Sequence, residues 1–129
     1  MKSPLLFVAL MCAVTLSSAS LFTTNAKPAK QRATTTFNEP VTIKGVLLKP
    51  GEYLFVHDDA AMMRGEACTF VYQGNSENAA KLLVSFHCTP AQRAKVASFT
   101  MRMERVAGVN ELREFQFSGD LEAHTVPGL

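Results

Sequence analysis

The stretch Phe99-Thr100-Met101-Arg102-Met103-Glu104 indicates the fold class, because apolar and polar residues alternate along it. A period of two places the apolar side chains on one face of a β-strand and the polar ones on the other. Phe115 and Phe117 repeat this spacing in a second run, 112–118. The register of the two runs stays open, since aligning Met103 with Phe115 would set Glu104 opposite Glu114, and like charges in that position destabilise a sheet.

Four further strand-like runs come earlier in the chain, at 41–48, 53–57, 67–72 and 81–88. Short strands separated by turn signals are typical of an all-β domain. We predict a small antiparallel β-sandwich or partly open barrel of about six strands, with one or two short helical turns. The helical turns are expected at 58–65, capped by an aspartate of the pair Asp58-Asp59, and at 89–95, where Thr89 and Pro90 form a capping signal.

A turn signal, Pro50-Gly51, separates the first two of these runs. It predicts a tight hairpin in which Leu48 faces Tyr53. The run 41–55 resembles the Pro-Gly-x-Tyr hairpin of small exported bacterial β-domain proteins of unassigned function. The resemblance covers these residues only, and it implies a fold type and a bacterial envelope setting but no catalytic residue.

The N-terminus has the order of a secretory signal peptide: basic Lys2, an apolar run from Leu5 to Leu16, and then small residues. The run is shorter than the roughly 20 residues that span a bilayer, so we expect cleavage, after Ser20 or preferably after Ala26. The mature chain is then secreted or periplasmic and has no membrane span. The predicted organisation is a signal peptide at 1–26, a flexible basic leader at 27–36 and a single β-domain at 37–129.

The chain is close to neutral, with 13 Lys and Arg against 11 Asp and Glu. Binding to nucleic-acid phosphates needs a concentrated excess of basic side chains. The sequence groups only Lys27, Lys30 and Arg32, which we interpret as part of the solvated leader. We therefore exclude nucleic acid as a main partner.

Two cysteines, Cys68 and Cys88, are expected in the exported chain, because Cys12 lies within the signal. Pairing the third and fourth strand-like runs by their apolar residues sets Phe70 opposite Phe86. The same register sets Cys68 opposite Cys88 on that face, within disulfide reach. Because exported proteins are usually oxidised, we predict a Cys68–Cys88 disulfide.

An alternative interpretation of the same region is a metal site. Its candidate ligands are His57, His87, Cys68 and Cys88, with Met62 or Met63 as soft ligands for copper. Two arguments count against it: His87 and Cys88 point to opposite faces of a strand, and the paired ligand spacing of zinc sites is absent. The sequence therefore predicts no metal and no cofactor.

Catalytic residues are not predicted either. His57-Asp58-Asp59 is interpreted as a strand end followed by a helix cap, and His124 as a residue of the C-terminal tail. No serine lies in a Gly-x-Ser-x-Gly elbow, and no Gly-rich phosphate loop is present. We predict an exported, non-catalytic, disulfide-stapled module that binds a protein, glycan or small ligand. The alternative is a periplasmic copper- or zinc-binding protein.

Overall fold

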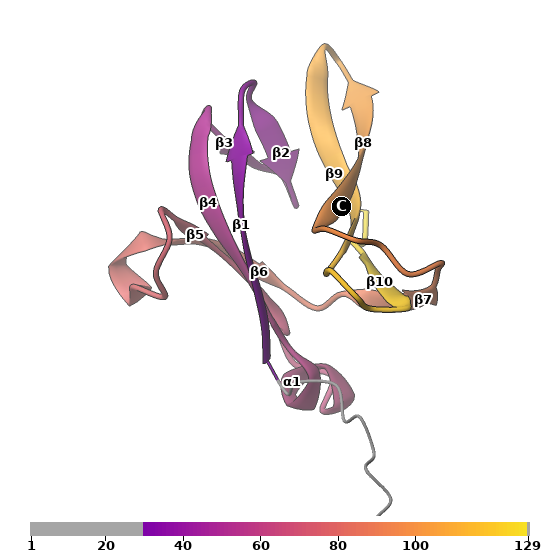
Figure 1. Ribbon diagram of the computed structural model, residues 1–129. Coiled ribbons are helices and arrows are strands. Elements are labelled where there is room, and N and C mark those ends of the chain that lie inside the picture. Colours follow the sequence, from indigo (N-terminus) through magenta and orange to yellow (C-terminus); the bar gives the residue numbers. More distant parts are fainter. Residues whose placement is uncertain (1–29, 129) are drawn as a thin grey trace, which may run out of the picture.

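The computed structural model describes residues 30–128, and within them the chain forms two β-sheets (Figure 1). The four-stranded sheet has the order β1 (Lys30–Phe37), β4 (Gly51–Asp58), β5 (Thr69–Gln73) and β6 (Leu82–Phe86). The six-stranded sheet has the order β3 (Val46–Leu48), β2 (Val41–Ile43), β9 (Val109–Gln116), β10 (Glu122–Thr125) and β7 (Thr89–Gln92), and β8 (Thr100–Val106) pairs with β9. The helical segments are α1 (Asp59–Met63) and a 3-10 turn, η1 (Ala79–Lys81).

Aromatic rings from both sheets fill the space between them. Phe55 of β4 is fully buried, with its ring centroid 5.6 Å from Phe115 of β9 and 5.3 Å from Phe99. Phe86 of β6 meets Phe115 edge-on at 6.5 Å. The predicted all-β sandwich is therefore confirmed, although the described residues form ten strands rather than about six.

The predicted flexible leader is wrong for residues 30–36, which belong to β1. This strand pairs with β4 along its whole length, from Lys30 opposite Asp58 to Phe37 opposite Gly51. Its outward positions are exposed and its inward positions, including Ala33, are partly or fully buried. The threonine-rich composition that suggested a solvated arm is also favoured in strands, and pairing with β4 selects the strand. The predicted signal peptide and residues 27–29 lie outside the described residues.

The hairpin predicted at Pro50-Gly51 is also wrong. The tight turn forms earlier, at Lys44-Gly45, where φ is 50° and 79°, and it joins β2 to β3 with Val41 opposite Leu48. Positive φ at both central residues is the geometry that matches the twist of a two-residue hairpin. Pro50-Gly51 instead moves the chain from β3 of one sheet to β4 of the other.

The predicted register between the third and fourth runs is displaced by one residue. Val71 of β5 lies opposite Val84 of β6, and Phe70 lies opposite Ser85. Val71 is therefore fully buried, whereas Phe70 is half-buried on the outer face. The error arises at the loop, because Tyr72 lies opposite Leu82 and not Val84, and the shift in the ladder between Tyr72 and Val71 reduces the displacement from two residues to one.

The helix predicted at 89–95 is replaced by strand β7, which pairs with β10 from Thr89 opposite Thr125 to Gln92 opposite Glu122. A capping signal is a local preference, and pairing with a neighbouring strand overrides it here. This pairing also makes His87 and Cys88 the link between the two sheets, because β6 and β7 belong to different sheets.

The register between β8 and β9, which the sequence left undecided, is set by a turn at Ala107-Gly108 and by a one-residue irregularity in the strand pairing after Arg102. Met101 lies opposite Phe115, so the expected clash between Glu104 and Glu114 does not arise. Glu104 instead faces Glu111. Arg113 contacts both carboxylates, Glu104 at 3.0 Å and Glu111 at 3.4 Å, and so offsets the repulsion between them.

Two matched substitutions test this packing. Phe55→Ala removes a fully buried ring between the sheets, and we expect it to lower the free energy of unfolding by about 3–5 kcal/mol. Phe70→Ala removes the same atoms from the outer face, and we expect a loss below about 1.5 kcal/mol. Urea denaturation measures both values, and equal losses would contradict the register described above.

Candidate metal centre

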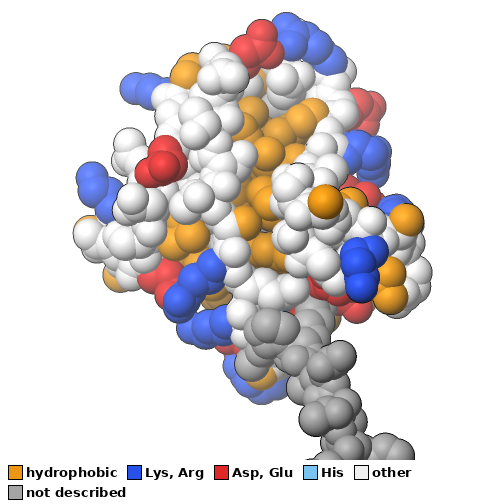
Figure 2. All heavy atoms as spheres, viewed as in Figure 1, with side chains coloured by type: hydrophobic (Ala, Val, Ile, Leu, Met, Phe, Trp, Pro, Cys, Tyr) orange, Lys and Arg blue, Asp and Glu red, His pale blue; other side chains and the backbone are white. Residues whose placement is uncertain are grey.

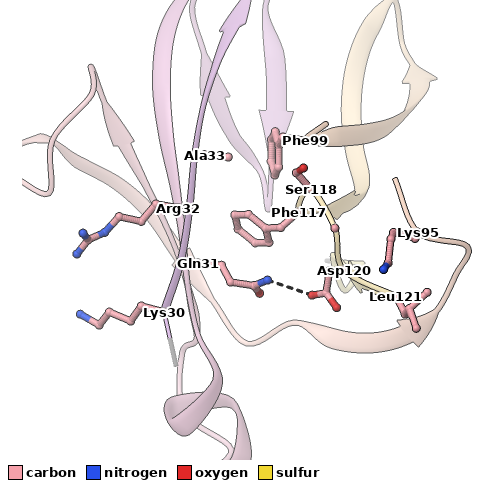
Figure 3. A pocket seen from close by; sticks show the side chains of 11 residues that line it. Lys30, Gln31, Arg32, Ala33, Lys95, Phe99, Phe117, Ser118, Asp120 and Leu121 are labelled. Atoms are coloured by element: carbon pink, nitrogen blue, oxygen red, sulfur yellow. Dashed lines mark hydrogen bonds between the residues drawn. The ribbon is translucent and has the colours of Figure 1, made fainter. Parts of the chain in front are cut away.

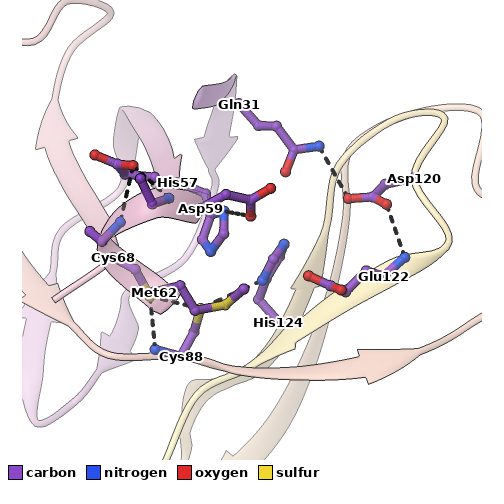
Figure 4. Close-up of polar contacts among 12 residues, drawn as sticks. Gln31, His57, Asp59, Met62, Cys68, Cys88, Asp120, Glu122 and His124 are labelled. Carbon is purple, nitrogen blue, oxygen red and sulfur yellow. Dashed lines mark hydrogen bonds and ion pairs between the residues drawn. The ribbon is translucent and has the colours of Figure 1, made fainter. Parts of the chain in front are cut away.

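Five side chains with nitrogen or sulfur ligand atoms meet between the sheets, and we call them the His–Cys cluster (Figure 4). His57 comes from the end of β4 and His124 from β10, so each sheet supplies one imidazole. Cys88 comes from the link between the sheets, and Cys68 directly precedes β5. Met62 comes from α1.

The ligand atoms of His57, Cys88 and His124 all lie within 4.8 Å of one another, and the three residues are buried. Cys88 Sγ is 3.5 Å from His124 Nδ1 and 3.8 Å from Met62 Sδ. Cys68 Sγ is 3.0 Å from Cys88 Sγ. A thiol, two imidazoles and a thioether thus converge on one point in the core.

The two imidazoles pack against each other, with ring centroids 3.9 Å apart. His124 also stacks on Phe115 at 5.2 Å, and His57 Nδ1 lies 3.3 Å from Asp59 Oδ1. Two cations at this separation in a buried site would be costly. The packing therefore disfavours a positive charge on both rings at once, and neutral imidazole is the form that binds metal ions.

The helix α1 positions the methionine of the cluster, and its sequence signal was read correctly. Asp58 is the N-cap, and its carboxylate accepts hydrogen bonds from the amides of Ala60 and Ala61. Met62 is half-buried against the core, whereas Met63 is 86% exposed. Of the two methionines considered as soft ligands, only Met62 reaches the cluster.

The two cysteines meet as predicted, although the predicted register is not the cause. Backbone hydrogen bonds hold Cys68 between β4 and β6: its amide donates to Phe86 at 3.0 Å, and its carbonyl accepts from Asp58 at 2.8 Å. The sulfur separation of 3.0 Å exceeds the S–S bond length of about 2.05 Å. The structure thus describes two buried thiols, and the disulfide stays a prediction.

His87 agrees with the sequence analysis, whereas His124 departs from it. His87 is exposed, and its Nδ1 donates to the carbonyl of Glu66 at 2.9 Å. The same nitrogen lies 4.0 Å from Cys68 Sγ, at the edge of the cluster, and His87 does not join the group formed by His57, Cys88 and His124. This agrees with the argument that His87 and Cys88 point to opposite faces. His124 was interpreted as a tail residue, which is wrong: it is fully buried in β10. The available signal was the run Ala123-His124-Thr125-Val126 after a Gly-Asp turn, which fits a short strand.

Burial raises the pKa of the Cys88 thiol to about 12, with a smaller contribution from its hydrogen bond with Cys68. At neutral pH this side chain is therefore protonated in the absence of a metal. A bound cation must displace the thiol proton, because the thiolate is the form that acts as a ligand.

A second candidate site is an open groove of about 650 Å³ between β1 and the segment 117–121. Figure 2 shows apolar side chains gathered in the hollow between the sheets, and Figure 3 shows Phe99 and Phe117 at the groove wall. A hydrogen bond of 3.1 Å from Gln31 to Asp120 joins the two sheets at one side of the groove. Lys95 supplies a cationic group at the rim.

Comparison with protein families, curated proteins and solved structures gives no match for this chain. The functional argument therefore rests on the chemistry of the site. Among residues 30–128, no helix has both the length and the apolar character needed to cross a membrane.

The raised pKa of Cys88 predicts a loss of stability in alkali. Because folding raises the pKa from 9.0 to about 12, the thiol form stabilises the fold below pH 9, and this contribution disappears as the pH approaches 12. We expect the Cys88 contribution to fall by about 2 kcal/mol between pH 8 and pH 10.5. Denaturation of the wild type and of Cys88→Ala at both pH values isolates the contribution of the Cys88 thiol. An equal loss of unfolding free energy in the two proteins would contradict the raised pKa of Cys88.

Proposed function

We propose that this protein binds a soft transition-metal ion, copper before zinc, in the His–Cys cluster. The observation that carries the proposal is the convergence of His57, Cys88 and His124, whose ligand atoms lie within 4.8 Å of one another in the core. Imidazole nitrogen and thiolate sulfur are common ligands of transition metals, and one ion could contact all three residues at once.

The ligand types favour copper. Two imidazoles and one thiolate with a weak thioether form the ligand set of mononuclear copper sites, and thiolate and thioether sulfur select Cu(I). Met62 Sδ lies 3.8 Å from Cys88 Sγ. The thioether is therefore next to the thiolate that would bind the copper ion. Zinc would instead use Cys68 as a fourth ligand, which gives the Cys₂His₂ set of structural zinc sites.

Asp59 is proposed as the residue that orients His57. Its carboxylate lies 3.3 Å from Nδ1 of the ring, and its side chain is 26% exposed. A carboxylate on one ring nitrogen fixes the tautomer and directs the other nitrogen toward a metal. Asp59 is thus the member of the site that reaches toward solvent.

We further propose that the protein acts outside the cytoplasm, as expected from the apolar run Leu5–Leu16. In an oxidising compartment, a Cys68–Cys88 disulfide and a metal ion would compete for Cys88. The disulfide-stapled module and the metal-binding protein are therefore two states of the same residues. A mass measurement of the intact protein distinguishes the two states. The disulfide form is lighter than the dithiol form by two hydrogens, whereas the metal-bound form is heavier by the mass of the bound ion.

The metal proposal is tested by anaerobic titration of the reduced protein with Cu(I) in competition with bathocuproine disulfonate. We expect one ion per chain, and we expect His124→Asn to weaken binding by more than about 100-fold because it removes a ligand. Asp59→Asn should weaken binding by about 10- to 100-fold through His57. His87→Asn is the matched control and should leave the affinity unchanged.

Equal Cu(I) affinity in His124→Asn and the wild type would overturn the assignment, provided that circular dichroism shows both to be folded. Retention of Zn(II) without Cu(I) binding would assign the cluster to zinc. In that case Cys68→Ser should abolish binding, since zinc needs the fourth ligand.

The groove supports a second function, the binding of a small ligand that was predicted in general terms from the sequence. Its volume of about 650 Å³ is within the range of small-molecule sites, and its walls combine the rings of Phe99 and Phe117 with polar and charged side chains. Lys30 and Arg32 form ion pairs with Glu77 on the outer face of β1. Both of these cations and Lys95 line the groove, and of these three described residues Lys95 is the one that forms no ion pair, so we propose an apolar molecule with one anionic group.

Two fluorescent probes test this function: anilinonaphthalene sulfonate, which is anionic, and N-phenylnaphthylamine, which is its neutral analogue. Ala33→Phe places a ring in the groove and should abolish binding of both. Lys95→Gln should weaken only the anionic probe, by about tenfold. Lys49→Gln is the control for charge, and equal effects of the two lysine substitutions would contradict the proposed role of Lys95.

A further inference from the structure

We propose that the thiols of Cys68 and Cys88 reduce Cu(II) to Cu(I) within the His–Cys cluster. This activity rests on the proposed copper binding and adds a reaction to it. The geometry that points to it is that Cys88 belongs to two pairs at once. Its sulfur lies 3.0 Å from Cys68 Sγ and 3.5 Å from His124 Nδ1.

The first pair is arranged for disulfide formation. The sulfurs need to approach by about 1 Å to reach bonding distance, which side-chain rotation can supply. The amide of Cys88 donates a hydrogen bond of 3.2 Å to Cys68 Sγ, which holds that sulfur beside its partner. Both cysteines are fully buried, so an oxidant that enters the cluster itself has an advantage over a bulky external disulfide.

The second pair brings the oxidant to the thiols. A Cu(II) ion held by His57 and His124 would contact Cys88 directly, because the ligand atoms of these three residues share one site. Coordination displaces the thiol proton and places the sulfur electrons next to the metal. The electron then passes from sulfur to copper without a separate carrier.

The reaction balances with two Cu(II) ions for each disulfide. The two S–H bonds of Cys68 and Cys88 break, one S–S bond forms, and two protons leave to solvent. The two electrons released reduce two Cu(II) ions, one after the other, to Cu(I). No other reductant or oxidant is needed for this single turnover.

Disulfide formation also changes the affinity of the site. It removes the thiolate of Cys88 from the ligand set and leaves the two imidazoles with the thioether of Met62. Since thiolate is the ligand that selects Cu(I), the oxidised cluster binds the product more weakly. The protein therefore takes up Cu(II) in its thiol form and gives up Cu(I) in its disulfide form.

The experiment mixes the reduced protein anaerobically with excess Cu(II) and follows Cu(I) by its coloured complex with bathocuproine disulfonate. The wild type should produce two Cu(I) ions per chain and lose two hydrogens in mass. Cys68→Ser keeps the three ligands but has no second thiol. It should produce no disulfide and should hold Cu(II) with an intense thiolate-to-copper absorption band.

Two controls keep the outcomes distinct. Zn(II) cannot accept an electron, so it should leave both wild-type thiols intact and titratable after denaturation. Cys68→Ala repeats the test in a variant without a buried hydroxyl group, and the Cu(I) affinity of both variants is measured independently.

Wild-type thiols that survive excess Cu(II), or a Cys68→Ser variant that forms Cu(I) at the wild-type rate, would overturn the proposed reaction. Either result could occur with Cu(I) binding intact, in which case the binding function stands and the redox activity fails. Loss of Cu(I) binding in the wild type would instead remove the function on which the reaction depends.

Discussion

The crossing of the chain between the two sheets at His87 and Cys88 places the cluster in the core. Successive residues of an extended chain point to opposite sides, so His87 lies at the surface while Cys88 points between the sheets. One strand of each sheet, β4 and β10, supplies an imidazole to the group that contains Cys88. A ligand set drawn from both sheets thus depends on one two-residue link, and its geometry is as rigid as the sandwich itself.

Much of the fold could be predicted because it follows from local patterns. The period of two in Thr100–Val106 predicts a strand with one buried face, and Asp58 predicts the start of α1. Two of the failures share a physical cause, because each of these segments pairs with a strand that is distant in the chain. Residues Lys30–Phe37 form a strand because they pair with β4. Residues Thr89–Gln92 form a strand because they pair with β10.

The candidate site was predicted in part for the same reason. Cys68 and Cys88 lie near the ends of consecutive strands, so their proximity could be inferred from strand pairing. His124 is 36 residues from Cys88, and no local motif links the two. The sequence argument therefore kept a metal site only as the alternative, because His87 and Cys88 point to opposite faces and no paired ligand spacing is present, and its reason for excluding His87 was sound.

The ring of Phe117 belongs to both candidate sites. It lines the groove, and its centroid lies 6.4 Å from His57 and 6.0 Å from His124. The apolar shell around a metal controls water access and local polarity, and through these the potential at which the metal exchanges electrons. Phe117 is only 3% exposed, so a guest in the proposed groove would press on this shell through the ring itself, and the two proposed sites would then be coupled through one side chain.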